Sequence, residues 1–223
     1  MLNFFRLYSG TELLIVCVAF LIVILFALTI HEFAHSYIAM TQGDYTSQYN
    51  GRLTLNPFKH IDPIGFLCLI FLGFGWAKPV PINSTKFKDY RKGLFLTSIA
   101  GVCANFICSF IFIGLLVLCF NNFNTLVIED LSYIQQFLFF LLYYGASINL
   151  GLAIFNLIPI PPLDGFNVIC SFTKGTNKFV GFLKRYGYFL LLILLIFGVI
   201  DILFSLVYNL IVPAFLKFWF YIF

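Results

Sequence analysis

Two histidines and a glutamate form the motif His-Glu-Phe-Ala-His at residues 31–35, directly after the uncharged apolar stretch Leu13–Ile30. His31 and His35 are four residues apart, so in a helix both imidazoles lie on one face and can reach one metal ion. Glu32 is then placed to act as a base toward water at that metal. Polar groups of this kind are costly inside hydrocarbon, so their position in an apolar helix indicates a functional site.

The composition is that of a membrane protein. Hydrophobic residues make up 61% of the chain and charged residues only 10%, whereas a soluble domain is usually about 25% charged. No segment is polar enough to form a separate soluble domain, so residues 1–223 are predicted to be one domain with a catalytic core of about 11–170. The six cysteines form no CxxC pair and are interpreted as core residues. The net charge of +4 is attributed to membrane topology rather than to nucleic-acid binding.

The sequence predicts an all-α polytopic membrane protein with about four transmembrane helices. A helix needs about 20 apolar residues to cross a bilayer. Four runs meet this requirement, at about 11–40, 94–119, 133–158 and 186–211. The first is expected to end at Gly43, a typical residue just beyond a helix C-terminus.

Loop charges predict how these helices are oriented. Segments 78–92 and 171–185 are rich in Lys and Arg, whereas segment 120–132 has none, so the positive-inside rule places both basic loops in the cytoplasm. Run 61–77 is short and interrupted by Pro and Gly, and it would enter and leave on the same side. We therefore expect a re-entrant segment there, possibly a β-hairpin, with a fifth full span as the alternative. His31 lies about 30 Å along the first helix, so the metal site is expected toward the cytoplasmic side.

A catalytic zinc normally has three protein ligands and one open position, so a third ligand is required. The remaining candidates are His60, Asp164 and Asp201. Asp164 lies in the proline-rich segment 156–165, which cannot continue a regular helix. An extended chain there would lie at the depth of the histidines, where a carboxylate can reach across. Asp201 is expected in mid-span of the last helix, protonated or hydrogen-bonded, and His60 is expected to be a positioning group in a cytoplasmic loop.

Several motifs resemble those of the site-2 protease family of intramembrane zinc metalloproteases. The matching stretches are HEFAH at 31–35, GRLTLNP at 51–57, HIDPIG at 60–65, WAKPVP at 76–81 and NLIPIPPLDG at 156–165. Together they resemble the compact bacterial branch that lacks a PDZ or CBS domain. Residues Gly101–Asn105 resemble the AGPxxN helix of the family, although Val102 replaces the usual Pro. Phe166 stands where many relatives have a second Gly, and both departures bear on local geometry rather than on a ligand.

The resemblance implies one zinc ion per chain, with His31, His35 and Asp164 as its ligands. It also implies Glu32 as the catalytic carboxylate and Asn156 as a residue near the zinc that holds the substrate backbone or the oxyanion. The implied reaction is hydrolysis of a peptide bond within or near the transmembrane segment of a membrane protein, as in regulated intramembrane proteolysis. The substrate would be a single-span regulatory protein or a signal-peptide remnant in a bacterial cell membrane. An exposed edge of the re-entrant segment could pair with the unwound substrate as an added strand.

Other interpretations remain open at several residues. Asn156 could instead form an inter-helix hydrogen bond, and Asn105 and Asn149 are interpreted as structural packing residues. The alternative function is that of a non-proteolytic membrane protein, such as a transporter or regulator that retains a zinc site. Glu32 argues against this alternative, because a purely structural zinc site does not need that carboxylate. The sequence specifies neither the physiological substrate nor the oligomeric state.

Overall fold

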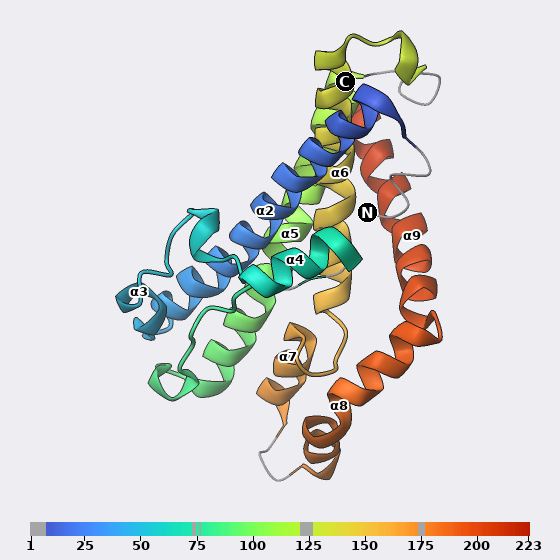
Figure 1. Ribbon diagram of the computed structural model, residues 1–223. Coiled ribbons are helices and arrows are strands. Elements are labelled where there is room, and N and C mark those ends of the chain that lie inside the picture. The colour runs from blue at the N-terminus through green and yellow to red at the C-terminus, as the bar shows by residue number, and fades with distance from the viewer. Residues whose placement is uncertain (1–7, 73–74, 76, 121–126, 174–176) are drawn as a thin grey trace.

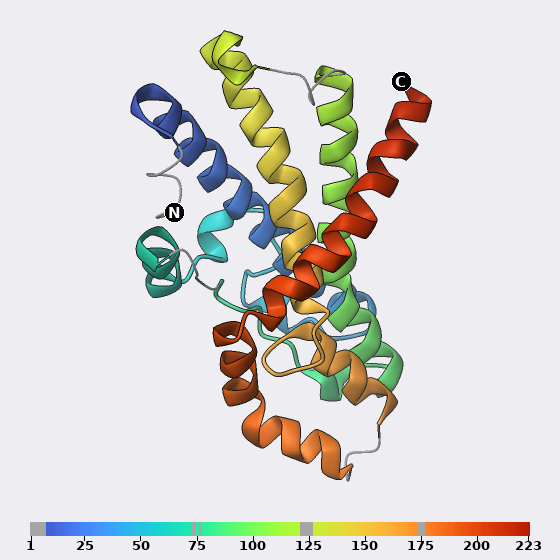
Figure 2. The same ribbon diagram turned by 90° about the vertical axis from the view of Figure 1, so that its right-hand side faces the viewer.

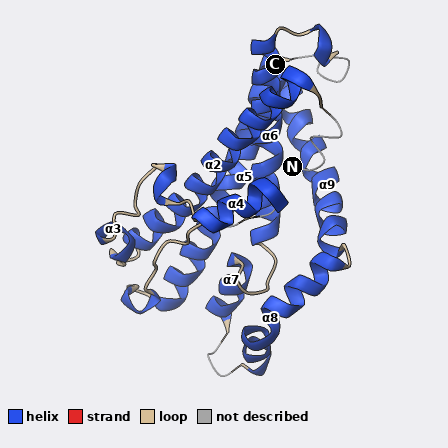
Figure 3. Cartoon of the chain, viewed as in Figure 1, coloured by secondary structure: helices blue, strands red, loops and turns tan. Residues whose placement is uncertain are grey.

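Helices dominate the computed structural model, which describes the chain except for residues 1–7, 73–74, 76, 121–126 and 174–176. The long helices are α2 (Gly10–Thr41), α5 (Tyr90–Cys119), α6 (Tyr133–Asn156), α8 (Lys178–Ile196) and α9 (Val199–Ile222). The short ones are α3 (Thr46–Tyr49), η1 (Pro57–Lys59), α4 (Pro63–Leu72), η2 (Ser84–Lys86), η4 (Ile128–Asp130) and α7 (Asp164–Phe172). The described residues contain no β-strand, as Figure 3 shows. The expected all-α class is therefore confirmed.

Helices α2, α5 and α6 pack against one another and form the core of the molecule (Figure 1). Val16 and Ala19 of α2 are fully buried against Phe140 of α6. On the other face of α6, Leu142 packs against Leu116 of α5. Small residues let membrane helices approach closely, and α2 buries Ala19 and Ala27 completely. These three packed helices position the polar motif of residues 31–35.

The helix directions agree with the predicted topology. In Figures 1 and 2, α2 and α6 run from the upper to the lower end of the molecule, whereas α5 and α9 run upward. The basic loop before α5 and the basic start of α8 lie at the same lower end. Helix η4, from the acidic loop, lies at the upper end with the C-terminus. The two basic segments therefore share one end, as the positive-inside rule requires.

The predicted C-terminal span at 186–211 is wrong, because the run forms two helices. Helix α8 ends at Ile196 and α9 begins at Val199, with Gly198 between them at φ 68°. This left-handed conformation ends a helix and is readily adopted only by glycine. Five helices of the described chain are consequently long and apolar enough to cross a membrane, and α8 is the additional one, at the lower end below α9 (Figure 2).

Asp201 is not in mid-span, because the break moves it to the first turn of α9. Its side chain is exposed there, and an acidic side chain interacts favourably with the positive end of a helix. Most of α9 faces away from the rest of the protein, since only 6% of its most apolar stretch is buried. Near its end, the Trp219 indole Nε1 donates to the Phe110 carbonyl oxygen of α5 at 3.0 Å. Trp219 also stacks on Phe223, with ring centroids 5.5 Å apart.

The two ends of the Gly-interrupted run 61–77 lie side by side. Ile61 and Ala77 form an isolated antiparallel bridge, and the Lys78 N–H donates to the His60 carbonyl oxygen at 2.8 Å. Between them lies α4, whose start is capped by Asp62 through bonds from the N–H groups of residues 64 and 65. The described part of this run is thus a helix rather than a β-hairpin, while its entry into the bilayer stays a prediction.

The end of the first helix follows the prediction. Helix α2 ends at Thr41 and Gly43 follows with φ 105°. Trp76, the first residue of the WAKPVP stretch, lies outside the described residues.

Candidate metal centre

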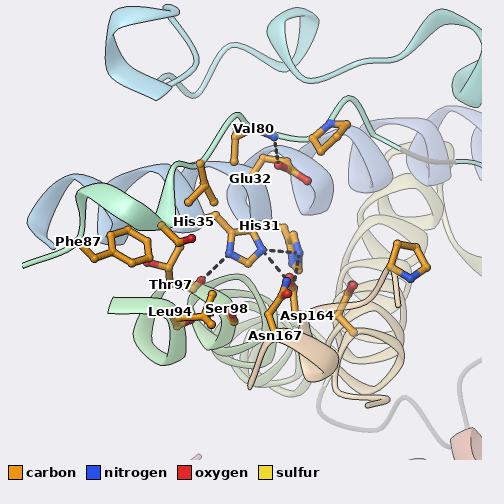
Figure 4. A pocket seen from close by; sticks show the side chains of 15 residues that line it. His31, Glu32, His35, Val80, Phe87, Leu94, Thr97, Ser98, Asp164 and Asn167 are labelled. Atoms are coloured by element: carbon orange, nitrogen blue, oxygen red, sulfur yellow. Dashed lines mark hydrogen bonds and ion pairs between the residues drawn. The ribbon is translucent and has the colours of Figure 1, made fainter. Parts of the chain in front are cut away.

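Three side chains from two distant parts of the chain converge on one point. His31 and His35 extend from α2, and their Nε2 atoms are 3.0 Å apart. Asp164 is the first residue of α7, and its Oδ2 lies 3.2 Å from each Nε2. Figure 4 shows both imidazoles pointing toward Asp164. Among the described residues this is the one group of three or more His, Cys, Asp or Glu side chains placed to hold a metal ion.

His31 is oriented by two buried asparagines. Its Nδ1 lies 2.6 Å from Asn105 Oδ1, while Asn105 Nδ2 donates to the Ala27 carbonyl oxygen and to Asn149 Oδ1. Asn149 Nδ2 donates in turn to the Gly145 carbonyl oxygen at 2.8 Å. Because Asn105 uses its NH₂ group elsewhere, its oxygen accepts from His31 Nδ1. The Nε2 lone pair of His31 therefore faces Asp164, in the arrangement typical of a metal-ligating histidine.

His35 is oriented by the backbone of α5. Its Nδ1 lies 2.7 Å from the Thr97 carbonyl oxygen, which can only accept a hydrogen bond, so Nε2 carries the lone pair. Gly101 provides the space for both rings. A Cβ atom at Gly101 would lie 2.6 Å from His31 Cε1 and from His35 Nε2. Glycine at this position allows α5 to pack directly on the two imidazoles.

Asp164 is placed by the non-helical stretch that joins α6 and α7. The expected departure from helix is confirmed, since α6 ends at Asn156 and α7 begins at Asp164. Gly165 makes the turn possible, because a Cβ atom there would lie 2.2 Å from the Leu157 carbonyl oxygen. The Asp-Gly pair is therefore a packing requirement of this turn as well as the carrier of the carboxylate.

These three atoms fit a zinc ion. With both Nδ1 atoms donating, the two Nε2 atoms and Asp164 Oδ2 are three acceptors facing one another, and Oδ2 is buried without a hydrogen-bond partner. Acceptors at such separations repel one another unless a cation lies between them. Zinc binds His nitrogen and Asp oxygen at about 2.0–2.2 Å, which is compatible with ligand atoms that lie about 3 Å from one another.

Glu32 directly follows His31, so its side chain leaves α2 about 100° around the helix axis from that of His31. In Figure 4 its carboxylate points toward Val80, away from Asp164. Its Oε2 accepts a hydrogen bond from the Val80 backbone N–H at 3.0 Å. The side chain is half-buried and lines the same cavity as the three converging ligands.

The cavity has a volume of about 420 Å³, and the remaining predicted site residue is on its wall. Asn156, the last residue of α6, lines it together with the converging ligands. Asn156 Nδ2 donates to the Leu152 carbonyl oxygen of its own helix at 3.0 Å. The inter-helix bond considered as the alternative is absent from the described hydrogen bonds of Asn156. Asn156 therefore lines the cavity, and its role in holding the substrate stays a prediction.

Two residues differ in importance from the sequence-based interpretation. Asn105 and Asn149, interpreted as packing residues, hold His31 through the chain of hydrogen bonds described above. One sequence pattern could have indicated that Asn105 lies beside the histidines. Gly101 and Asn105 are four residues apart and lie on one face of α5, just as His31 and His35 do on α2. His60 is not near the ligands; it is buried in the loop before α4, with Nε2 2.9 Å from the Thr54 carbonyl oxygen.

Comparison with known proteins gives the family. The description Peptidase family M50 matches residues 125–194, which include Asp164. A relative from Bacillus subtilis (strain 168), YwhC, is 38% identical over 176 residues, which cover 78% of this chain and 78% of YwhC. This chain belongs to peptidase family M50. The Rip2 protein of Mycolicibacterium smegmatis is 28% identical over 178 residues, covering 77% of this chain and 64% of Rip2. Rip2 of Mycobacterium tuberculosis (strain H37Rv) is 26% identical over 196 residues, covering 82% and 71%.

The relatives named above all carry the description "Putative zinc metalloprotease". No solved structure matches the chain. Membership of M50, the site-2 protease type, makes this protein a zinc metalloprotease of the membrane, and the predicted family, enzyme class and cofactor are confirmed. The bacterial relatives and the apolar helices agree with a multi-pass membrane protein.

Proposed function

We propose that this M50 protease hydrolyses a peptide bond within or near the transmembrane segment of a membrane-protein substrate. One observation carries the proposal: Glu32 and the three converging ligands line one cavity among membrane helices. His31 lies about 30 Å along α2, so the cavity belongs to the lower end of the bundle. The basic segments lie at the same end, which supports an active site toward the cytoplasmic side.

We assign the metal to His31, His35 and Asp164. A bound zinc ion supplies Lewis acidity for the scissile carbonyl and lowers the pKa of water toward neutrality. Glu32 is the residue that takes the proton from the attacking water and delivers it to the leaving amine. The Val80 N–H holds the carboxylate of Glu32 in the cavity while it does so. Asn156, on the cavity wall, is placed to hold the substrate backbone or to stabilise charge on the scissile carbonyl oxygen.

The substrate must present an unwound backbone to this cavity. In a helix every carbonyl oxygen accepts from the N–H four residues onward, so the scissile bond is inaccessible until the helix opens. A single-span regulatory protein or a trimmed signal-peptide remnant meets this requirement, because each leaves a short helix in the bilayer. We therefore propose that the protein acts in regulated intramembrane proteolysis.

The first experiment compares the purified wild-type protein with Glu32→Gln in detergent. Glutamine has the size of glutamate but cannot accept the proton. We expect the wild type to cleave a synthetic transmembrane peptide and Glu32→Gln to lose cleavage by about 10²–10⁴-fold, the usual contribution of general acid–base catalysis. Bound zinc, measured by elemental analysis, should be the same in both, because Glu32 is not among the converging ligands.

A second substitution separates proteolysis from the alternative function. Glu12→Gln, at the first turn of α2, makes the same chemical change far from the cavity and should leave cleavage intact. Bound zinc with no cleavage of any transmembrane peptide by the wild type would favour the non-proteolytic transporter or regulator. Cleavage retained by Glu32→Gln would contradict the assigned role.

A further inference from the structure

The segment opposite Glu32 offers one hydrogen-bond donor to the catalytic carboxylate. We call residues 77–83 the strap; it runs as irregular chain between the Ile61–Ala77 bridge and η2. The Val80 N–H donates to Glu32 Oε2 at 3.0 Å. Pro79 and Pro81 flank Val80 and have no N–H. Across these three residues the strap can therefore donate only through Val80.

An arginine holds the strap from the other side. The Arg52 side chain contacts the strap, where its Nη2 donates to the Lys78 carbonyl oxygen at 2.5 Å and, at the longer distance of 3.5 Å, to the Pro79 carbonyl oxygen. Only 8% of Arg52 is exposed. Its Nε is buried without a hydrogen-bond partner, and no acidic side chain among the described residues forms a salt bridge with it. Burying a guanidinium without a carboxylate partner is costly. The burial of Arg52 therefore indicates that its guanidinium has a specific binding role, which a solvent-exposed lysine could not fulfil.

The peptide between Pro79 and Val80 connects Arg52 to Glu32. In a planar trans peptide the carbonyl oxygen and the N–H point in opposite directions. The oxygen of this unit faces Arg52 at 3.5 Å, and its N–H faces Glu32 at 3.0 Å. Fixing the orientation of one end of this unit fixes that of the other.

We propose that Arg52 is a positioning residue for Glu32, acting through the Pro79–Val80 peptide of the strap. The guanidinium sets the plane of this peptide, and the Val80 N–H then holds the carboxylate toward the cavity. The inference rests on the proposed role of Glu32 as the proton-transferring group. Arg52, which lies more than 20 residues from Val80 in the sequence, would then affect turnover rather than metal binding.

The other contacts of the strap cannot replace Arg52. The Lys78 N–H donates to the His60 carbonyl oxygen at 2.8 Å, and the Asn83 N–H donates to Asp44 Oδ2 at 2.6 Å. These bonds hold the two ends of the strap. Neither contacts the Pro79–Val80 peptide, whose plane can rotate between fixed ends. Among the described contacts, the one on its carbonyl oxygen comes from Arg52.

The test compares Arg52→Ala with Arg52→Lys and with Arg91→Ala. Arg91 is exposed at the start of α5 and its loss makes the same charge change without touching the strap. We expect Arg52→Ala to lower kcat by about 10-fold to 100-fold, the usual cost of misplacing a catalytic group by about 1 Å. The KM for the transmembrane peptide and the bound zinc should stay at the wild-type values. Arg52→Lys retains a donor and should recover part of kcat, and Arg91→Ala should match the wild type.

Hydrogen exchange provides a readout independent of turnover. Because residues 79 and 81 are prolines, exchange from residues 79–81 comes from the Val80 N–H alone. We expect faster exchange at Val80 in Arg52→Ala and equally in Glu32→Ala, with unchanged exchange in α2. An unchanged Val80 rate in Arg52→Ala, a rise in KM alone or a parallel loss of zinc would overturn the proposal. If the wild type cleaves no peptide, the proposed function fails, but the exchange experiment still decides whether Arg52 orients this peptide.

Discussion

The two sides of the HExxH motif are supported by different kinds of structure. His31 and His35 face a helix and are held by fully buried groups, an asparagine side chain and a carbonyl oxygen of α5. Glu32, in the same helical turn, faces a loop and accepts one backbone N–H. The metal side therefore belongs to the helical core, while the side of Glu32, the proposed proton-transferring group, depends on an irregular segment (Figure 4).

This difference predicts that zinc binding and turnover can be changed separately. Substitutions behind the histidines should release zinc and reduce stability, because they disturb close packing between helices. Substitutions in or under the strap should reduce turnover while zinc stays bound. The predictions below test this separation, in order of decreasing effect.

Removal of Asp164 should have the largest effect. Asp164→Ala deletes one of three converging ligands, so bound zinc should fall well below one per chain and cleavage should become undetectable. Elemental analysis and the peptide assay measure both quantities. Asp201→Ala is the matched control, since this exposed carboxylate lies at the start of α9. Full zinc occupancy in Asp164→Ala would remove it from the ligand set.

Gly101→Ala should disturb both histidines at once. The new Cβ atom would lie 2.6 Å from atoms of both rings, so α5 or α2 must shift. Overpacking of this kind costs about 1–3 kcal/mol of stability, and we expect a lower melting temperature together with weaker zinc binding. Gly151→Ala on α6 is the control, because a Cβ atom there would meet nothing within 4 Å. Equal behaviour of the two variants would show that α5 does not constrain the imidazoles.

Asn105→Ala should weaken zinc binding without removing a ligand. His31 would lose its Nδ1 partner, and loss of such a partner usually lowers metal affinity by about 10-fold to 100-fold. Competition with a chelator measures this affinity. Asn209→Ala, at an exposed position of α9, serves as the control. An unchanged affinity would return Asn105 to the role of a packing residue.

Asp44 offers the smallest effect, on the strap side. Its side chain is fully buried; although burial opposes ionisation, hydrogen bonds from Thr46 and from the Asn83 N–H hold the pKa of its carboxyl below the usual value. Asp44→Ala should lower kcat by a few-fold, less than Arg52→Ala, with zinc unchanged. Loss of zinc in this variant would contradict the separation of the two sides.

The pH dependence of this anchor follows from the direction of the shift. A carboxyl whose pKa is depressed in the folded state stabilises that state above its ordinary pKa of about 3.9. Exchange of the Asn83 N–H should therefore show constant protection, after correction for intrinsic rates, from pH 8 down to roughly that value. Protection should be lost as the pH falls further through the folded-state pKa. Loss of protection already near neutrality would contradict an ionised anchor.

The sequence predicted the metal side far better than the strap side. Long apolar runs and the i, i+4 spacing of His31 and His35 are strong signals, because a spanning helix and a shared metal each impose a simple pattern. The function of Asn105 was missed, because an asparagine in a membrane helix is as readily explained by inter-helix bonding. The contact between Val80 and Glu32 involves a backbone N–H, and no side-chain pattern encodes it.

The break between α8 and α9 was missed for a related reason. Glycine is common within transmembrane helices, so Gly198 in an apolar run does not by itself predict a helix end. Only the left-handed conformation seen in the structure identifies its function. The helical form of residues 63–72 was also unexpected, because proline and glycine around an apolar run favour turns as readily as a short helix.

The position of Trp219 allows the contact between α9 and α5 to be followed by fluorescence. The chain has two tryptophans, so Trp76→Phe would leave Trp219 as the single indole fluorophore. Its N–H donates to the α5 backbone, and its ring contacts those of Phe110 and Phe223. Emission wavelength and quenching by brominated lipids would report whether the end of α9 stays docked on α5 or moves into the bilayer. The protease thus carries an intrinsic optical probe at the end of the molecule remote from the metal centre.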